Sequence, residues 1–352
     1  MRQVDETARG DSVSGPAPLL AQAERAQTER AMTYAQALNL ALVEEMERDD
    51  AVIVLGEDVG AFGGVFTVTR GLQERFGSGR VRDTPISETG FLGCAVGAAM
   101  CGLRPVAEVM FVDFTLVALD QIVNQAAKLR YISGGQVGVP LVVRTQQGAR
   151  PGTAAQHSQA LEALFAHVPG LRVVAPATPR DARGLLKAAI RCDDPVIFLE
   201  HKALYTTSGA VPLAEEVIPL GQAAIARPGR DVTAFTYAAM LPVVLSAAEA
   251  LAEEGVSVEV IDLRSLAPLD DEAVRRSVGR TNRAVVIHEA WRRGGFGAEL
   301  VGTIQDLAFD ALDAPVGRVG ARDTPKPFSA GLDRAYLPDR ERVADALRAA
   351  LR

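Results

Sequence analysis

The chain has 352 residues, 48% of them hydrophobic and 23% charged, which is typical of a soluble globular protein with room for two domains. Its net charge of -7 and the absence of any lysine and arginine run argue against nucleic acid as a partner, and no apolar stretch reaches membrane-spanning length. No export signal begins the chain, so we expect a cytoplasmic protein with no membrane partner. Cys94, Cys101 and Cys192 lack zinc-site spacing, and we expect all three to be small buried side chains.

The chain begins with a polar stretch, residues 1–30, that contains Ser-Gly-Pro-Ala-Pro and predicts a flexible leader. Apolar strands then alternate with amphipathic helices over residues 31–205. The strands are almost continuously apolar, which is typical of a parallel sheet with helices on both faces. The expected helices are Thr33–Arg48, Gly90–Gly102, Thr115–Ile132 and Pro179–Arg191, and the expected strands are Ala51–Leu55, Pro105–Phe111, Pro140–Arg144, Arg172–Val174 and Val196–Glu200.

Residues 206–220 are rich in Thr, Ser, Gly, Pro and Glu without clear periodicity, and we expect a linker there. A second and smaller α/β domain is predicted over residues 221–352. Its expected strands are Val232–Tyr237, Val256–Ile261 and Ala284–His288, and its expected helices are Leu241–Glu254, Gly297–Leu312 and Asp339–Leu351.

Glu88 is the most informative single residue, because it directly precedes a helix that carries no charge until Arg104. A carboxylate beside such a helix is costly to desolvate unless a partner neutralises it, and burial raises a carboxyl pKa towards the range where it can share a proton. Glu88 is therefore a candidate for proton chemistry. The alternative, which the sequence leaves open, is that it only caps the helix.

Three further segments follow predicted strands, where ligands gather in open parallel sheets. They are Gly56–Gly64 with Glu57, Met110–Thr115 with Phe114, and Thr145–Gln159 with His157. His157 lies in a long polar loop of the kind that is usually functional, although it could simply bond local backbone. Turn acids explain Glu57 and Asp58 equally well, and core packing explains Phe114 better than ligand binding does. The spacings G-x-G-x-x-G and G-x-x-x-x-G-K-[ST] are absent, so nicotinamide and P-loop chemistry are not supported.

Taken together, several ordered blocks between residues 32 and 352 carry a resemblance. GEDV, DTPISE, GLRPVAE, DQIxNQAAKLRY, AAQHSQ and HEAW–GGFGAE resemble the beta subunits of the thiamine-diphosphate-dependent decarboxylating component of 2-oxo acid dehydrogenase complexes, a transketolase-like group. MFVDFTLVALDQIVNQAAKLRY and DDPVIFLEHKALY look most like acetoin dehydrogenase, pyruvate dehydrogenase is close behind, and FGGVF is shared with the branched-chain enzyme. The resemblance implies a pyrimidine-binding domain followed by a transketolase C-terminal domain.

The same resemblance implies roles for particular residues. Glu88 would hydrogen-bond the aminopyrimidine ring of thiamine diphosphate and assist its activation, Phe114 would stack on that ring, and His157 would serve acyl transfer to a lipoyl group. Other residues implied at the cofactor are Glu57, Ile86 and Met110. The family also has a structural monovalent cation, K⁺, bound mainly by backbone; the matching residues here are Ala189, Ile190, Cys192 and Asp194.

Partners are implied as well. The chain contains no Gly-Asp-Gly motif, which in thiamine enzymes holds Mg²⁺ and the diphosphate, so an alpha subunit is expected to supply that half of the site. The expected assembly has two alpha and two beta subunits and delivers its product to a lipoyl acyltransferase core. The rival hypotheses are a non-catalytic scaffolding paralogue, a branched-chain beta subunit and a self-sufficient transketolase-like enzyme.

Overall fold

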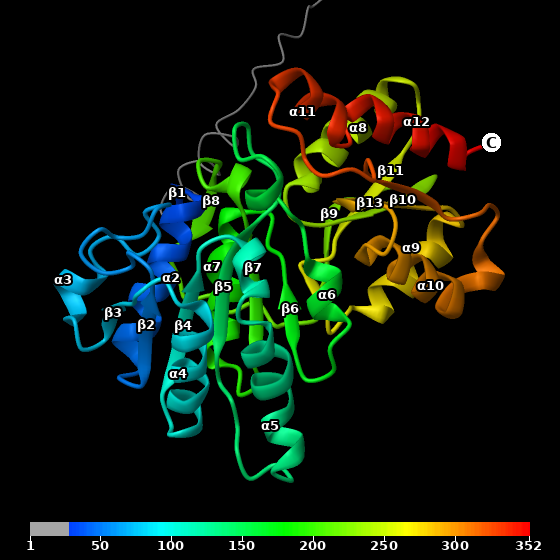
Figure 1. The fold of residues 1–352 in the computed structure, drawn as a ribbon. Helices are drawn as coiled ribbons and strands as arrows, with labels where there is room; N and C mark the ends of the chain where they lie inside the picture. The colour runs from blue at the N-terminus through cyan, green and yellow to red at the C-terminus, as the bar shows by residue number, and fades with distance from the viewer. Residues whose placement is uncertain (1–27) are drawn as a thin grey trace, which may run out of the picture.

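The computed structural model describes residues 28–352, which form two lobes lying side by side (Figure 1). The first lobe is built on a seven-stranded sheet in the order β12-β6-β7-β5-β4-β2-β3, in which only β12 is antiparallel. The parallel sheet that the apolar strands indicate is therefore confirmed. Its strands are β2 (Val52–Gly56), β3 (Val81–Asp83), β4 (Arg104–Val109), β5 (Val142–Gln147), β6 (Arg172–Val174), β7 (Val196–His201) and β12 (Ser265–Ala267).

Helices cover both faces of this sheet, and the alternation of side chains along each strand explains how. Residues such as Val54 and Val106 pack against α2 (Tyr34–Arg48) and α7 (Pro179–Arg191). Their neighbours Leu55 and Ala107 point the other way and pack against α4 (Glu88–Met100). Short helices α3 (Leu72–Phe76) and α6 (Glu162–Ala166) lie in the connections.

One segment that was expected to be a single α-helix is only partly α-helical. The segment predicted as Thr115–Ile132 contains a 3₁₀ turn, η1 (Val112–Leu116), then a π-helical stretch, η2 (Gln121–Ala126), and only then α5 (Ala127–Ile132). β-branched residues lower helix propensity here, and the Thr115 hydroxyl donates to the Val112 carbonyl oxygen at 2.5 Å, which favours the tighter turn.

The cysteine expectation is also wrong. Cys94 and Cys101 are exposed and Cys192 is half-buried. The small residues of α4 pack on the sheet along one side only, so the two α4 thiols lie on its outer side.

The second lobe has a five-stranded sheet in the order β14-β13-β10-β11-β9, parallel except for β9. Helices α8 (Met240–Glu253) and α12 (Arg340–Ala350) cover one face, while α9 (Asp271–Thr281) and α10 (Phe296–Ala308) cover the other (Figure 1). The strands are β9 (Ala224–Arg227), β10 (Val232–Thr236), β11 (Val258–Asp262), β13 (Ala284–Trp291) and β14 (Gly317–Ala321), and α11 (Ala330–Tyr336) precedes α12.

The region between the lobes is more ordered than its composition indicates. The predicted linker, residues 206–220, contains β8 (Ser208–Pro212), which pairs antiparallel with β1 (Glu29–Thr33). The last residues of the predicted leader therefore belong to β1, and residues 1–27 lie outside the described part of the chain. Met32 and Val211 pack on Ala37 beneath this ribbon.

A buried ion cluster links three central strands. Arg144 of β5 is fully buried; its guanidinium donates to Glu200 of β7 at 2.6 and 2.9 Å and to Glu108 of β4 at 2.7 Å. Tyr205 donates a further hydrogen bond to Glu200. Burial alone would lower the pKa of Arg144, but the two glutamates raise it, so the guanidinium stays charged.

The two lobes are connected by more than the chain between them. Strand β12 comes from the second lobe and pairs with β6 of the first. Arg264 pairs with Asp181 at 2.6 Å, and Tyr237 donates to Glu162 at 2.6 Å. Within residues 28–352, no helix is both long and apolar enough to span a bilayer.

Candidate functional site

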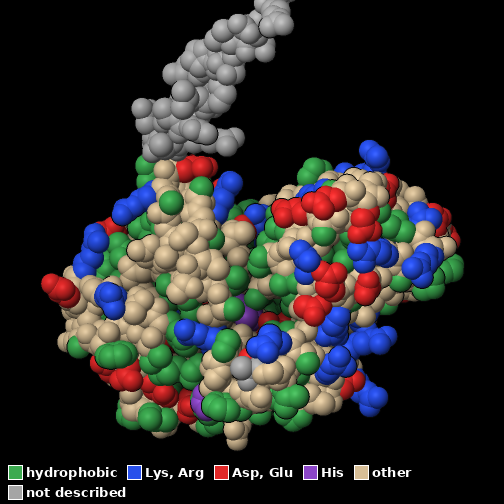
Figure 2. All heavy atoms as spheres, turned by 90° about the horizontal axis from the view of Figure 1, so that it is seen from above, with side chains coloured by type: hydrophobic (Ala, Val, Ile, Leu, Met, Phe, Trp, Pro, Cys, Tyr) green, Lys and Arg blue, Asp and Glu red, His purple; other side chains and the backbone are tan. Residues whose placement is uncertain are grey.

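The predicted site residues meet at one edge of the first sheet, where the parallel strands end. Glu57 follows β2, Glu88 follows β3, Phe114 follows β4 and His157 follows β5. Figure 2 shows histidine, acidic and basic side chains gathered in the hollow where the two lobes meet. The expectation that ligands gather at the carboxyl ends of strands therefore leads to one continuous site.

Two carboxylates form one half of this site. Glu88 is the first residue of α4, is 8% exposed, and its carboxylate makes no hydrogen bond or ion pair with any described residue. Glu57 carries a buried Oε1 that also lacks a hydrogen bond. Burial raises the pKa of Glu57, and the negative charges of Glu88 and Asp58 raise it further. Helix capping explains where Glu88 lies, but its side chain makes no capping hydrogen bond with the described residues.

Three rings form the other half. The His157 ring lies edge-on to Phe111 at 4.9 Å and to Phe114 at 5.4 Å between centroids. Phe111 has a positive φ of 69°, which is rare for a bulky residue, and its N–H donates to Gln146 Oε1 at 3.0 Å. The backbone turns sharply at Phe111 and so aims both phenyl rings at the end of the β5 loop.

The loop that carries His157 is held at both ends. The Gly148 N–H donates to the Gln159 carbonyl oxygen at 2.8 Å, and Gln159 Nε2 donates to Asp113 Oδ1 at 2.9 Å. His157 itself forms no hydrogen bond with the described residues; its contacts are with the two phenyl rings. The alternative that His157 only bonds local backbone is therefore not what the structure has.

Met110 and Ile86, the remaining predicted cofactor residues, are less buried than Glu88. Met110 is half-buried directly after β4, beside the ring cluster in sequence. Ile86 is 83% exposed, between β3 and α4, so little of it packs on the described residues. A role for Ile86 at the cofactor stays a prediction.

The predicted cation residues lie among arginines. Arg104 donates to the carbonyl oxygens of Ile190 and Cys192 at 3.0 and 3.1 Å, and the Asp194 carboxylate pairs with Arg130 and Arg172. The carbonyl oxygen of Ala189 accepts from the N–H of Cys192.

These positive charges disfavour a monovalent cation at that place. No group of three or more metal-ligating His, Cys, Asp or Glu side chains occurs in the described residues. A K⁺ site at these four residues stays a prediction without support from the arrangement.

Sequence reasoning missed Lys202, which follows β7 at the same sheet edge. Its ammonium is buried without a hydrogen bond and lies 5.2 Å from the centroid of the Phe111 ring. Burial lowers its pKa to about 8, against the opposing effect of nearby Asp113 and Glu289. The carboxyl-end rule applied to β7 would have found it.

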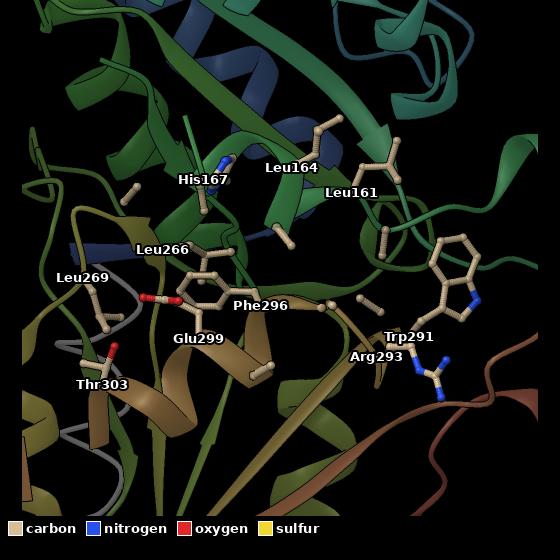
Figure 3. Close-up of a pocket in the computed structure, with 18 of the residues that line it drawn as sticks. Leu161, Leu164, His167, Leu266, Leu269, Trp291, Arg293, Phe296, Glu299 and Thr303 are labelled. Carbon is tan, nitrogen blue, oxygen red and sulfur yellow. The ribbon is translucent and has the colours of Figure 1, made fainter. Parts of the chain in front are cut away.

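A large cavity lies elsewhere and does not contain this chemistry. It measures about 1040 Å³ and is formed between α6 and α10, with Leu161, Leu164 and His167 facing Phe296, Glu299 and Thr303 (Figure 3). None of the buried polar atoms that lack a hydrogen bond lines it. Several of the unsatisfied groups, among them Glu57 Oε1 and Lys202 Nζ, instead follow the ends of β2 and β7, and the candidate site is placed there.

Comparisons with known proteins identify the family of the chain. The family model described as the transketolase pyrimidine binding domain matches residues 30–207, and that of the transketolase C-terminal domain matches residues 221–343. The chain is 48% identical to the mitochondrial pyruvate dehydrogenase E1 component subunit beta-2 of Oryza sativa subsp. japonica, over 91% of this chain and 86% of that protein.

Two other relatives carry different names. The chain is 47% identical to the acetoin:2,6-dichlorophenolindophenol oxidoreductase subunit beta of Cupriavidus necator, over 91% of this chain and 97% of that protein. It is 44% identical to the 2-oxoisovalerate dehydrogenase subunit beta of Bacillus subtilis, over 90% and 98%. A solved structure titled split gene transketolase, inactive beta4 tetramer, has a TM-score of 0.74 at 24% identity, over 91% of this chain and 98% of that one, and shows the same fold.

The low pKa of Lys202 predicts a stability effect. The unfolded chain keeps this proton up to about pH 10.5 and the folded chain only to about pH 8, so the lysine destabilises the fold fully below pH 8 and progressively less up to pH 10.5. Lys202→Met should therefore raise the free energy of unfolding at pH 7 by roughly 1–3 kcal/mol. Denaturant unfolding at pH 7 and pH 9.5 measures this, and the gain should be smaller at the higher pH.

Lys128→Met is the matched control, because its ammonium is bonded to the Pro169 carbonyl oxygen at 2.7 Å. It should give no gain at either pH. A loss of stability in Lys202→Met at pH 7 would show that the ammonium is satisfied in the fold and contradict this account.

Proposed function

The chain belongs to the transketolase-like family of E1 beta subunits of 2-oxo acid dehydrogenases, and from this premise we propose that it is the catalytic beta subunit of an acetoin or pyruvate dehydrogenase. It acts with an alpha subunit on a 2-oxo acid or acetoin and passes the acyl unit to a lipoyl group. The observation that carries the proposal is a pair of acidic side chains after β2 and β3: the Glu88 carboxylate, on a residue that is 8% exposed, forms no hydrogen bond with the described residues, and the half-buried Glu57 has a buried Oε1 without a hydrogen bond.

The residues present fit the pyrimidine half of thiamine diphosphate, the cofactor on which this family depends. Glu88 offers a buried unpaired carboxylate for a ring nitrogen, Glu57 a second acceptor, and Phe114 a half-buried ring for stacking. When bound, thiamine diphosphate supplies an electron sink for cleavage beside a carbonyl. The chain's own contribution would be the Glu88 carboxylate, which would exchange a proton with the ring nitrogen, and nearby Glu57, whose pKa is raised by burial and by the negative charge of Glu88.

His157 is proposed to serve the second half-reaction. It is half-buried in the loop after β5, its ring lies edge-on to the Phe111 and Phe114 rings, and neither ring nitrogen forms a hydrogen bond with the described residues. An imidazole can donate a proton near neutral pH, which an opening lipoyl disulfide requires.

The exposed surface of the chain, as well as the candidate site, supports the proposed partners. Large exposed apolar side chains occur in two places: Leu116 and Val117 lie just after Phe114, whereas Met100, Leu103, Tyr131 and Ile132 lie at or just beyond the C-terminal ends of α4 and α5, away from Glu88. Such a surface indicates a protein interface. We propose that it is covered in a heterotetramer by the alpha subunit, which holds Mg²⁺ and the diphosphate, and by the second beta subunit; a lipoyl acyltransferase core receives the product.

Two alternative functions differ from the proposed one. A branched-chain beta subunit is supported by the 2-oxoisovalerate relative, and a scaffolding paralogue would have no use for unpaired acidic groups such as Glu57 Oε1.

The cytoplasm is the proposed location, although the rice relative is named mitochondrial.

Dependence on an alpha subunit is the first prediction. The purified chain should bind thiamine diphosphate weakly and show no decarboxylation, because only one half of the site is present. Adding the alpha subunit with Mg²⁺ should restore both, as calorimetry and a CO₂-release assay can measure. Tight cofactor binding by the isolated chain would contradict the divided site.

Glu88→Gln is the second. The substitution keeps the size of the side chain but removes proton sharing, so turnover of the reconstituted enzyme should fall by about 10²–10⁴. Circular dichroism and size-exclusion chromatography should show an unchanged fold and assembly. Near-normal turnover would remove Glu88 from the mechanism.

His157→Ala is the third. Acyl transfer to a lipoyl domain should fall more than decarboxylation measured with an artificial electron acceptor, because only the transfer needs a proton from this side chain. Equal losses in both assays would assign His157 a structural role instead.

A further inference from the structure

Glu289 of β13, in the HEAW motif, extends from the second lobe to the base of the His157 loop. Its carboxylate is 8% exposed. Oε1 accepts the N–H of Ala149, the second residue of the loop, and Oε2 accepts from His201 Nε2 at 2.6 Å. One side chain of the second lobe thus bonds two elements of the first.

The hydrogen bonds fix which form of His201 is present. The N–H of Ala203 donates to His201 Nδ1 at 3.1 Å, so Nδ1 is the acceptor nitrogen and the proton lies on Nε2. His201 therefore donates to Glu289. Burial alone would raise the pKa of Glu289, but His201, the Ala149 N–H and Lys202 together hold it below its usual value, so the carboxylate is charged.

The loop has little freedom at this point. Gly148 has φ of 83°, and a Cβ there would lie 1.9 Å from His201 Nε2. Only glycine permits the close approach that brings Ala149 to Glu289. The Gly148–Gln159 hydrogen bond then closes the loop, with His157 two residues before its far end.

We propose that Glu289 is a positioning residue for His157: by bonding Ala149 and His201 it fixes residues 148–159 so that the imidazole stays against Phe111 and Phe114. The role rests on the function proposed for His157. It also makes the second lobe part of the transfer step, because a shift of β13 would move the loop.

Glu289→Gln tests the tether directly. The amide keeps the volume but replaces one acceptor oxygen by an NH₂ group that faces an N–H donor. Hydrogen–deuterium exchange of peptides covering residues 148–159, measured on the purified full chain, should become about tenfold faster or more. Glu289→Asp keeps the charge but not the reach, so it should give a smaller increase, and it carries the test if the glutamine variant does not fold.

Glu259→Gln is the matched control. Glu259 is also a buried carboxylate of the second lobe, but it bonds Thr233 at 2.8 Å and pairs with Arg280, away from the loop. Its variant should lower stability without changing exchange in residues 148–159. Unchanged loop exchange in both Glu289 variants would overturn the proposal.

The assembled enzyme gives a second readout. Glu289→Gln should reduce transfer to a lipoyl domain more than decarboxylation with an artificial acceptor, and adding it to His157→Ala should cause no further loss of transfer. Additive losses would overturn the positioning role. Faster loop exchange in an enzyme whose wild type transfers nothing to lipoyl domains would support the tether and reject the proposed function.

Discussion

The ion cluster of Arg144, Glu108 and Glu200 is the constraint on which the rest of the site depends. It ties β4, β5 and β7 together in the middle of the sheet, and removing one partner from such a buried cluster typically destabilises a fold by about 3–5 kcal/mol. The same cluster extends towards the ligand edge. Glu108 also accepts from Gln146 at 3.1 Å, and Gln146 in turn accepts the N–H of Phe111. The strained turn at Phe111, and through it the position of the rings, is therefore determined by charges in the core.

The sequence predicted the layered architecture and the sheet edge well, because both depend on local signals. Apolar runs such as Val196–Glu200 and the amphipathic Pro179–Arg191 specify their elements with few residues. What it did not reveal depends on contacts between distant segments. The pairing of β1 with β8 joins residues about 180 positions apart, and β12 leaves its own lobe to pair with β6. Neither has a periodicity that indicates its partner.

The same difference between local signals and long-range contacts explains which site residues the sequence revealed and which it did not. Glu88 and His157 were found because each is unusual within its own segment. His201 and Glu289 look ordinary in sequence, as polar or charged residues at the ends of strands, and their importance appears only when the ends of β7 and β13 meet, whereas Lys202 could have been found from its place after β7. A histidine next to a lysine has no spacing signature, so only the fold could show that one bonds the second lobe and the other lies beneath Phe111.

Charged groups differ in how they are paired. Arg144, Asp181 and Glu162 each have a partner among the described residues, although Asp181 Oδ1 and Glu162 Oε2 lack a hydrogen bond, whereas the Glu88 carboxylate, Glu57 Oε1 and Lys202 Nζ, at one sheet edge, form no hydrogen bond with the described residues. Leaving such groups unpaired lowers stability, and natural proteins accept that loss mainly where activity requires it. Two carboxylates, an ammonium and a set of rings at the carboxyl ends of neighbouring strands match a ligand with a ring nitrogen and a charged reaction partner. Under the proposed function the alpha subunit completes this half of a site, so the chemistry belongs to the assembly.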